Sequence, residues 1–141
     1  MANTDCPGAL SLELPFMDQA HAEFTGLLQR VDQADDAQLP DAWRDVVAVA
    51  EKRFAIEDGW MHDTAFASRR GHALQHRVVL EVMRDGIRQA REGRLPQVRQ
   101  MAAQFSDWYH KHVQSLDAAL ALHLRGRGFD PAGGATQALK A

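Results

Sequence analysis

The chain has 141 residues, a length typical of one domain that can bury an apolar core without disulfides or structural zinc. Hydrophobic residues make up 45% and charged residues 25% of it, and the net charge is −3, so the composition is that of a globular protein with no nucleic-acid partner. No apolar run approaches the roughly 20 residues of a membrane-spanning helix, so no membrane partner is expected. The start of the chain lacks a secretory pattern and the single Cys6 cannot form an internal disulfide, which predicts a cytoplasmic location.

The first half of the chain predicts an arm and two helices. Residues 1–15 contain two prolines and a glycine and are expected to form an extended arm. Apolar residues recur at helical spacing over 16–34, which predicts the first helix. Pro40 suits the first turn of a second helix, expected to extend to residue 63.

The second half predicts two further helices and a tail. The third helix is expected between Ser68, a suitable N-cap, and Gly93, a suitable stop. Pro96 opens the fourth helix, which ends before the glycines that follow residue 124. Residues 126–141 are expected to form a C-terminal tail.

Four helices joined by short loops, with no strand-like alternation beside them, predict an all-α fold. The expected architecture is an antiparallel up-down-up-down four-helix bundle over residues 16–125, with the extended N-terminal arm before it. A bundle by itself does not indicate a function, so function must be argued from its side chains.

The third helix carries a histidine pair at the spacing of metal ligands. His72 and His76 are four residues apart and therefore project from one face about one turn apart. The same face continues through the apolar Val79, Met83 and Ile87, so the pair is expected to point into the bundle. A single histidine in such a place is usually a core residue, but two that face other polar groups favour a metal.

The other helices also place polar side chains on their apolar faces. His21 lies on the first, Glu57 on the second, and His112 on the fourth, with Asp117 five residues later. An ionised carboxylate buried without a partner would cost several kcal/mol, and a cation shared among these groups removes that cost. The four helices are therefore predicted to contribute to one metal site. Imidazole and carboxylate ligands suit iron, manganese or zinc.

This arrangement resembles the hemerythrin-like family over about residues 15–124. The segments that carry the resemblance are MDQAH at 17–21, RFAIEDGWM at 53–61, HALQH at 72–76 and WYHKHVQSLD at 108–117. The resemblance is specific because order, spacing and helix assignment all agree.

Members of that family hold two irons between four helices and bind dioxygen reversibly, so the resemblance implies iron as the cofactor. It implies six metal ligands here, which are His21, Glu57, His72, His76, His112 and Asp117. The last three histidines of this set would bind one iron, the two carboxylates would bridge both irons, and His21 would bind the second.

The seventh ligand position of the family, a histidine, is occupied by Arg53, which is always protonated and cannot be a normal metal ligand. Two outcomes remain open. The guanidinium could fill the second metal's space and neutralise Glu57 and Asp117, which would leave one iron. Alternatively it turns outward, and water or His62 completes a weakened second position. His62 is a poor substitute because it lies about 140° round the helix from Glu57.

The remaining polar residues near these segments are expected to have other roles. His110 and His123 fall off the apolar face and are expected to be solvated. Asp18 is three residues before His21 and could accept a hydrogen bond from it, but capping of the first helix is the favoured role.

The predicted ligands and the family resemblance together imply non-enzymatic binding of dioxygen or another small diatomic ligand at an iron site altered by Arg53. No catalytic residue is assigned. One alternative is an iron-dependent peroxidase- or oxygenase-like enzyme, in which the vacated ligand position admits a substrate. Another is a metal-poor helical bundle that binds a partner through its surface.

Overall fold

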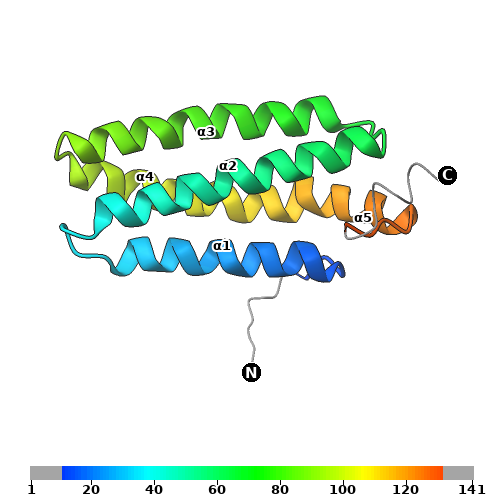
Figure 1. Cartoon of the computed structure of the whole chain (residues 1–141), viewed down its shortest axis with the longest axis horizontal. Helices are drawn as coiled ribbons and strands as arrows, with labels where there is room; N and C mark the ends of the chain where they lie inside the picture. Colours follow the sequence, from blue (N-terminus) through cyan, green and yellow to red (C-terminus); the bar gives the residue numbers. More distant parts are fainter. Residues whose placement is uncertain (1–10, 132–141) are drawn as a thin grey trace, which may run out of the picture.

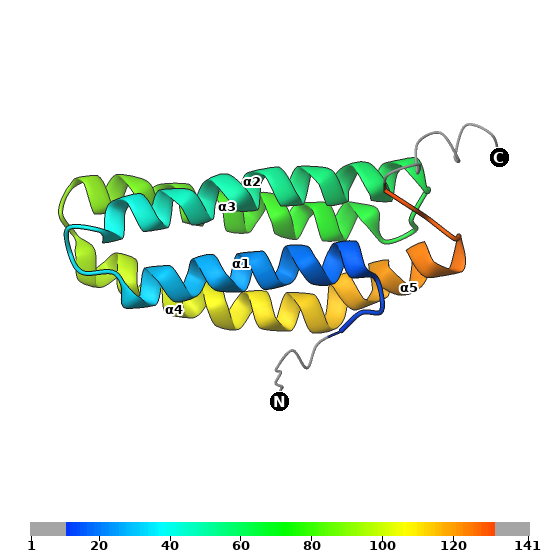
Figure 2. The same ribbon diagram turned by 60° about the horizontal axis from the view of Figure 1, so that its bottom comes forward.

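The computed structural model describes residues 11–131, which form an antiparallel four-helix bundle. The helices are α1 (Pro15–Gln33), α2 (Leu39–Asp63), α3 (Arg69–Arg91) and α4 (Leu95–His112), and the last is continued by the π-helical turn η2 (Val113–Asp117) and by α5 (Ala118–Gly126). Figures 1 and 2 show successive helices running in opposite directions, with α4, η2 and α5 along one line. The all-α, up-down-up-down prediction is confirmed. None of the described helices is long and apolar enough to cross a membrane.

Prolines and a glycine set the helix boundaries much as the sequence predicts. A proline occupies the first turn of α1, α2 and α4, where its fixed φ suits the helix and its missing N–H leaves no bond unmade. Gly93 adopts φ +82° directly after α3, a conformation that a residue with a Cβ rarely adopts. Ser68 precedes α3 as expected, but its side chain makes no capping hydrogen bond.

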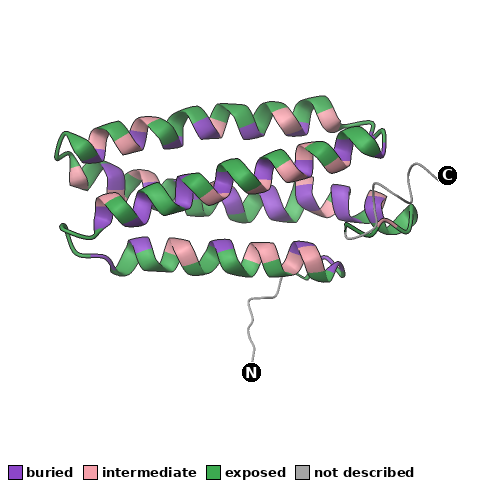
Figure 3. Cartoon of the chain, viewed as in Figure 1, coloured by how far each residue is buried: buried purple, intermediate pink, exposed green. Residues whose placement is uncertain are grey.

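Figure 3 shows that the buried residues lie on the sides of the helices that face one another. The fully buried Trp43 on α2 donates its indole N–H to the carbonyl of Met83 on α3, at 3.0 Å. The same ring occupies the space that a Cβ at Gly86 would need, so α2 and α3 approach closely there. This packing holds the helices at one end of the bundle and leaves room for polar side chains farther along α2 and α3.

Packing continues beyond both predicted ends of the bundle. Residues 1–10 of the expected arm lie outside the described part of the chain, but Leu12 and Leu14 are buried and the Leu12 carbonyl accepts a hydrogen bond from Arg125. Of the expected tail, Phe129 lies against Phe16 and the ring of Trp60 on α2. Apolar side chains therefore tie the described parts of the arm and the tail to the bundle.

Candidate metal centre

Five buried side chains converge in the interior of the bundle. They are Glu57 on α2, His72 and His76 on α3, His112 on α4 and Asp117 at the end of η2. One nitrogen or oxygen atom from each lies within 4.8 Å of those from all the others. The structure thus brings together five of the six residues predicted from the sequence, and we refer to them as the cluster.

The π-helical turn explains how the fourth helix contributes two side chains to the cluster. Residues five apart lie about 140° from each other around an α-helix and would not face the same point. In η2 the wider turn brings them onto one side, so that Asp117 Oδ1 lies 3.2 Å from His112 Nε2.

The imidazoles turn their Nε2 atoms toward one another and toward the carboxylates. His72 Nε2 lies 3.2 Å from His112 Nε2 and 3.1 Å from Asp117 Oδ1. His76 Nε2 lies 3.3 Å from Glu57 Oε1. Three nitrogen atoms and two carboxylate oxygens, contributed by α2, α3, α4 and η2, therefore surround one small volume.

His21, the sixth predicted residue, lies beside the cluster on its α1 side. Its Nε2 is 3.1 Å from Asp117 Oδ2, whereas His72 and His112 contact the other oxygen of that carboxylate. Asp117 therefore stands between His21 and the three clustered imidazoles. The His21 side chain is 13% exposed and lines a cleft of about 940 Å³ between α1 and α4.

Two polar residues that the sequence did not predict to be part of the site orient two of the cluster imidazoles. His76 Nδ1 donates to Asp58 Oδ1 at 2.8 Å, and His112 Nδ1 donates to Gln75 Oε1 at 3.3 Å. These bonds leave both Nε2 atoms free to face the cluster, as metal-binding histidines require. Asp58 and Gln75 sit at the solvent-facing borders of their helices, so no apolar periodicity marks them. Only their positions next to Glu57 and His76 could have drawn attention to them.

Aromatic rings cover the same two imidazoles. Phe54 stacks on His76 with the ring centroids 4.1 Å apart and the planes 1° from parallel. Trp108 stacks on His112 at 4.6 Å and 20°. These contacts fix the ring orientations and exclude water from this side of the cluster.

Burial and neighbouring charges raise the pKa of Glu57 and His76 and lower that of Asp117. Burial, together with the charge of Asp117, raises the pKa of Glu57. Burial also opposes ionisation of Asp117, but the imidazoles of His112, His21 and His72 outweigh it and hold its pKa well below the usual value. Burial alone would lower the pKa of His76, yet the carboxylates of Asp58 and Glu57 raise it to about 9.

The cluster fits a divalent or trivalent cation. Glu57 Oε1, Asp117 Oδ1 and His76 Nε2 are buried without a hydrogen-bond partner, although each faces the others. Such atoms are costly to leave unpaired in a core, and a cation among them would satisfy all three at once. Nitrogen and carboxylate oxygen donors suit iron, manganese or zinc.

Arg53 forms its ion pair with Glu23 and not with the cluster carboxylates Glu57 and Asp117. Its Nη2 donates to Glu23 Oε1 on α1 at 2.7 Å, and its side chain is 35% exposed. The guanidinium Nε is buried without a hydrogen-bond partner. Of the two outcomes left open by the sequence, an outward-turned side chain agrees with this geometry, because Glu23 rather than Glu57 or Asp117 receives the charge.

His62 lies away from the cluster. Its side chain is 84% exposed and its Nδ1 faces the neighbouring Asp63 at 3.4 Å. The expectation that it could substitute for a missing ligand is therefore not met, because its place on α2 turns it to solvent as the helical angle indicated.

The other polar residues singled out in the sequence have structural roles. His110 is exposed as expected. His123 is half-buried rather than solvated, since its Nε2 contacts Thr64 Oγ1 at 3.0 Å and its ring lies against Phe66. Asp18 accepts hydrogen bonds from Ser11 and from the Leu12 N–H, so it holds the arm and does not orient His21.

Comparison with known proteins agrees with the geometry. The chain is 31% identical over 122 residues to a bacteriohemerythrin of Ralstonia nicotianae, an alignment that covers 86% of this chain and 89% of that protein. No family model and no solved structure matches the chain. Identity at this level over nearly the whole of both chains, together with the cluster, shows that the chain belongs to the hemerythrin-like family.

Proposed function

We propose that this chain is a non-haem iron protein that binds dioxygen or another small diatomic ligand and is not an enzyme. The observation that carries the proposal is the buried convergence of three imidazole nitrogens and two carboxylates from three helices and the π-helical turn. Family membership supports iron as the metal, and the name of the bacteriohemerythrin relative supports a hemerythrin-type function.

In this proposal the cluster residues and His21 bind iron at two positions. His72, His76, His112, Glu57 and Asp117 would hold one iron. His21, on the far side of Asp117, would contribute to a second position. Iron, when bound, supplies an open coordination position and the electrons that hold a diatomic ligand reversibly.

The chain's own residues control what reaches this centre. The stacked rings of Phe54 and Trp108 close the cluster where they cover His76 and His112. The cleft between α1 and α4 reaches His21 and the neighbouring Tyr109. Burial and the charges of Asp117 and Glu57 raise the pKa of Tyr109 far above its usual value, so its hydroxyl stays neutral and protonated beside the site.

Arg53 makes the second iron position weaker than the first. An arginine offers no lone pair, so the position beside His21 lacks the ligand that the family's pattern places one turn before Glu57. The ion pair with Glu23 holds the guanidinium toward the α1 surface, which leaves the space beside His21 without a further protein ligand. We therefore assign one firmly held iron and one weakly held iron.

Metal analysis of the purified chain tests this assignment. The unmodified protein is expected to retain about one iron per chain after desalting, and Arg53→His is expected to raise this to about two because it restores an imidazole donor. Arg53→Gln removes the charge without adding an imidazole and is the matched control, expected to stay near one. Two tightly held irons in the unmodified protein would contradict the assignment, and no retained metal would contradict the proposed function.

Admission of oxygen tests the ligand. The reduced, iron-loaded protein is expected to gain a visible absorption band in air and to lose it when oxygen is removed. His76→Ala, which deletes one cluster nitrogen, is expected to lose the band. If the iron-loaded protein shows no reversible change with dioxygen, nitric oxide or another diatomic ligand, the binding function is wrong even if iron is present.

A further inference from the structure

The surface of α3 exposes an apolar stripe that the metal centre does not explain. Leu74, Val78 and Val82 are 50%, 57% and 51% exposed and follow one another at intervals of four residues. They are three of the four large hydrophobic residues exposed in residues 11–131, the fourth being Leu122 on α5. Contiguous exposed apolar surface of this kind typically marks an interaction site.

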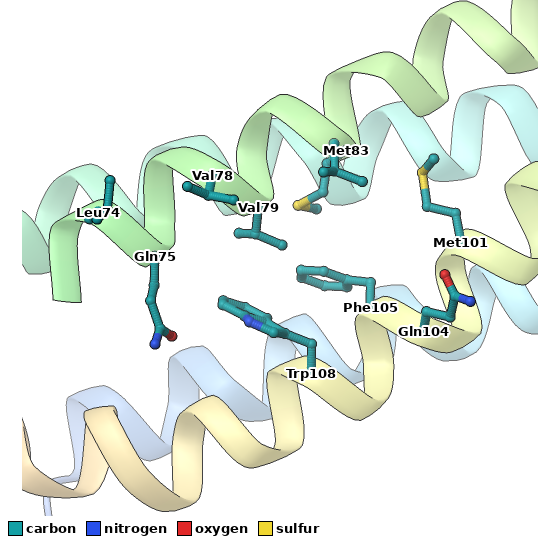
Figure 4. Close-up of a pocket in the computed structure, with 10 residues that line it drawn as sticks. Leu74, Gln75, Val78, Val79, Met83, Met101, Gln104, Phe105 and Trp108 are labelled. Atoms are coloured by element: carbon teal, nitrogen blue, oxygen red, sulfur yellow. The ribbon is translucent and has the colours of Figure 1, made fainter. Parts of the chain in front are cut away.

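A groove between α3 and α4 continues the stripe inward. Its volume is about 500 Å³, and Figure 4 shows side chains of α3 facing Met101, Phe105 and Trp108 of α4 across it. Gln75 and Gln104 are the polar residues in its lining. The stripe and the groove together form one apolar face, which we call the α3–α4 face.

Several charged residues border the stripe on the side away from α4, and Arg77 and Glu81 lie closest to its middle. Arg77 and Glu81 are exposed, lie four residues apart, and have neither an ion pair nor a hydrogen bond to another side chain among the described residues. They centre on Val79, one residue from the middle of the stripe at Val78. The two residues nearest the middle of the stripe on this border therefore carry opposite charges, and their midpoint lies one residue from Val78.

We propose that the α3–α4 face binds a second copy of this chain through a two-fold axis near Val79. An antiparallel pair of α3 helices related by this axis packs the stripe of each copy against the other. It also brings Arg77 of each copy opposite Glu81 of the other copy. This follows because the two-fold axis places the border of α3 that faces away from α4 beside the same border of the second copy. The dimer then contains two such ion pairs, and each charge is paired once.

This symmetry favours a second copy over a different protein. The interface is self-complementary in polarity, since an apolar stripe meets an identical stripe, and in charge, since Arg77 meets Glu81 across the axis. The packing would also cover Trp108 and Gln75, which contact His112, so the dimer would shield one side of the cluster. The proposal rests on the surface residues and does not depend on the proposed iron function.

Sedimentation velocity of the full chain over a range of concentrations tests the proposal. The unmodified protein is expected to form a dimer, and Val78→Asp is expected to convert it to a monomer by placing a charge at the centre of the stripe. Leu122→Asp is the matched control, because it changes another exposed hydrophobic residue, on α5, and should leave the dimer intact. A monomer at every concentration, or a dimer unaffected by Val78→Asp, would overturn the proposal.

Reversing the charges of Arg77 and Glu81 distinguishes dimerisation through this interface from dimerisation through another surface. Arg77→Glu sets acid against acid across the axis, and Glu81→Arg sets base against base, so each variant alone should weaken the dimer by about tenfold or more. Arg77→Glu combined with Glu81→Arg in one chain should restore it. An equimolar mixture of the two single variants should form mixed dimers. Single variants that dimerise as the unmodified protein does, or a mixture that stays monomeric, would exclude the proposed pairing.

Discussion

Arg53 shows how a charged side chain beside the cluster can be held by a group on a neighbouring helix. It sits one turn before Glu57 on α2, four residues away in sequence. Its charge is instead held by Glu23 on α1, at the partly exposed border of the bundle. The carboxylates of Glu57 and Asp117 are therefore left to the histidines and to whatever cation the cluster holds.

Asp58 offers a test of the electrostatics through the metal-free protein. It holds His76 by a 2.8 Å hydrogen bond, and with Glu57 it outweighs burial and raises the pKa of His76 from 6.5 to about 9. A group whose pKa is higher in the folded state stabilises the fold below its unfolded pKa and loses that contribution as the pH rises through the folded value. Stability of the chelator-treated protein should therefore fall by about 3 kcal/mol between pH 6.5 and 9.

Urea unfolding of Asp58→Asn across the same pH range measures this contribution. The variant should show a shallower fall, since the neutral amide no longer favours the charged imidazole. Asp41→Asn, an exposed acid near the other end of α2, should keep the dependence of the unmodified protein. A metal-free protein whose stability does not change over this range would contradict the role given to Asp58.

At the scale of the elements, η2 is the feature that completes the cluster. A regular α-helix continuing from α4 would direct Asp117 away from the rest of the cluster, and its carboxylate would not lie between His21 and His112. The π-helical turn costs backbone hydrogen-bond geometry, which is why such turns are short and often found at functional sites. The downstream Leu120, Ala121 and Leu124 of α5 are fully buried, so the turn is held in place by packing on its far side.

Gly86 marks where the packing of α2, α3 and α4 is tightest. A Cβ at this position would lie 2.6 Å from both Met101 Sδ and Trp43 Nε1, and Trp43 is fully buried and hydrogen-bonded. Gly86→Ala should therefore lower the free energy of unfolding by about 1–3 kcal/mol, because the indole cannot move without losing its bond.

Gly71→Ala is the matched control for this change on the same helix. No atom lies within 4 Å of its added Cβ, so it should be neutral or stabilise by up to about 1 kcal/mol through helix propensity. Urea denaturation of the two variants measures both effects. Equal stabilities would show that the close approach at Gly86 is not a constraint on the fold.

At the scale of the whole molecule, the metal is expected to act as a cross-link. The cluster joins α2, α3, α4 and η2 at one point, and those elements separate on unfolding. A cation that binds the folded chain and not the unfolded one adds about 2.7 kcal/mol at a free concentration 100 times its dissociation constant. Removal of iron should therefore lower the thermal midpoint, and iron should restore it.

Calorimetry with and without chelator provides the measurement. The same comparison on His76→Ala should show a much smaller difference between the two conditions, because that variant lacks one of the three imidazoles of the cluster. An identical midpoint with and without metal in the unmodified protein would indicate that the ion is not bound in the cluster.

The sequence by itself determined the features that depend on local chemistry. The spacing of apolar residues and the prolines in the first turns predict four helices, because helix formation and termination depend on near neighbours. The pair His72 and His76 follows from a four-residue interval in the same way. The apolar helix faces also pointed to Glu57, His112 and Asp117, which the structure brings together with the pair, and the family resemblance assigned these residues to iron.

Only the tertiary structure decided where side chains at helix borders turn. Arg53 meets Glu23, 30 residues away in sequence, and Asp58 meets His76 across two helices. Thr64 contacts His123 in the same manner, at a separation of 59 residues. A side chain at such a border can face solvent or a neighbour, and the choice depends on which groups another helix places beside it, information that no local pattern contains.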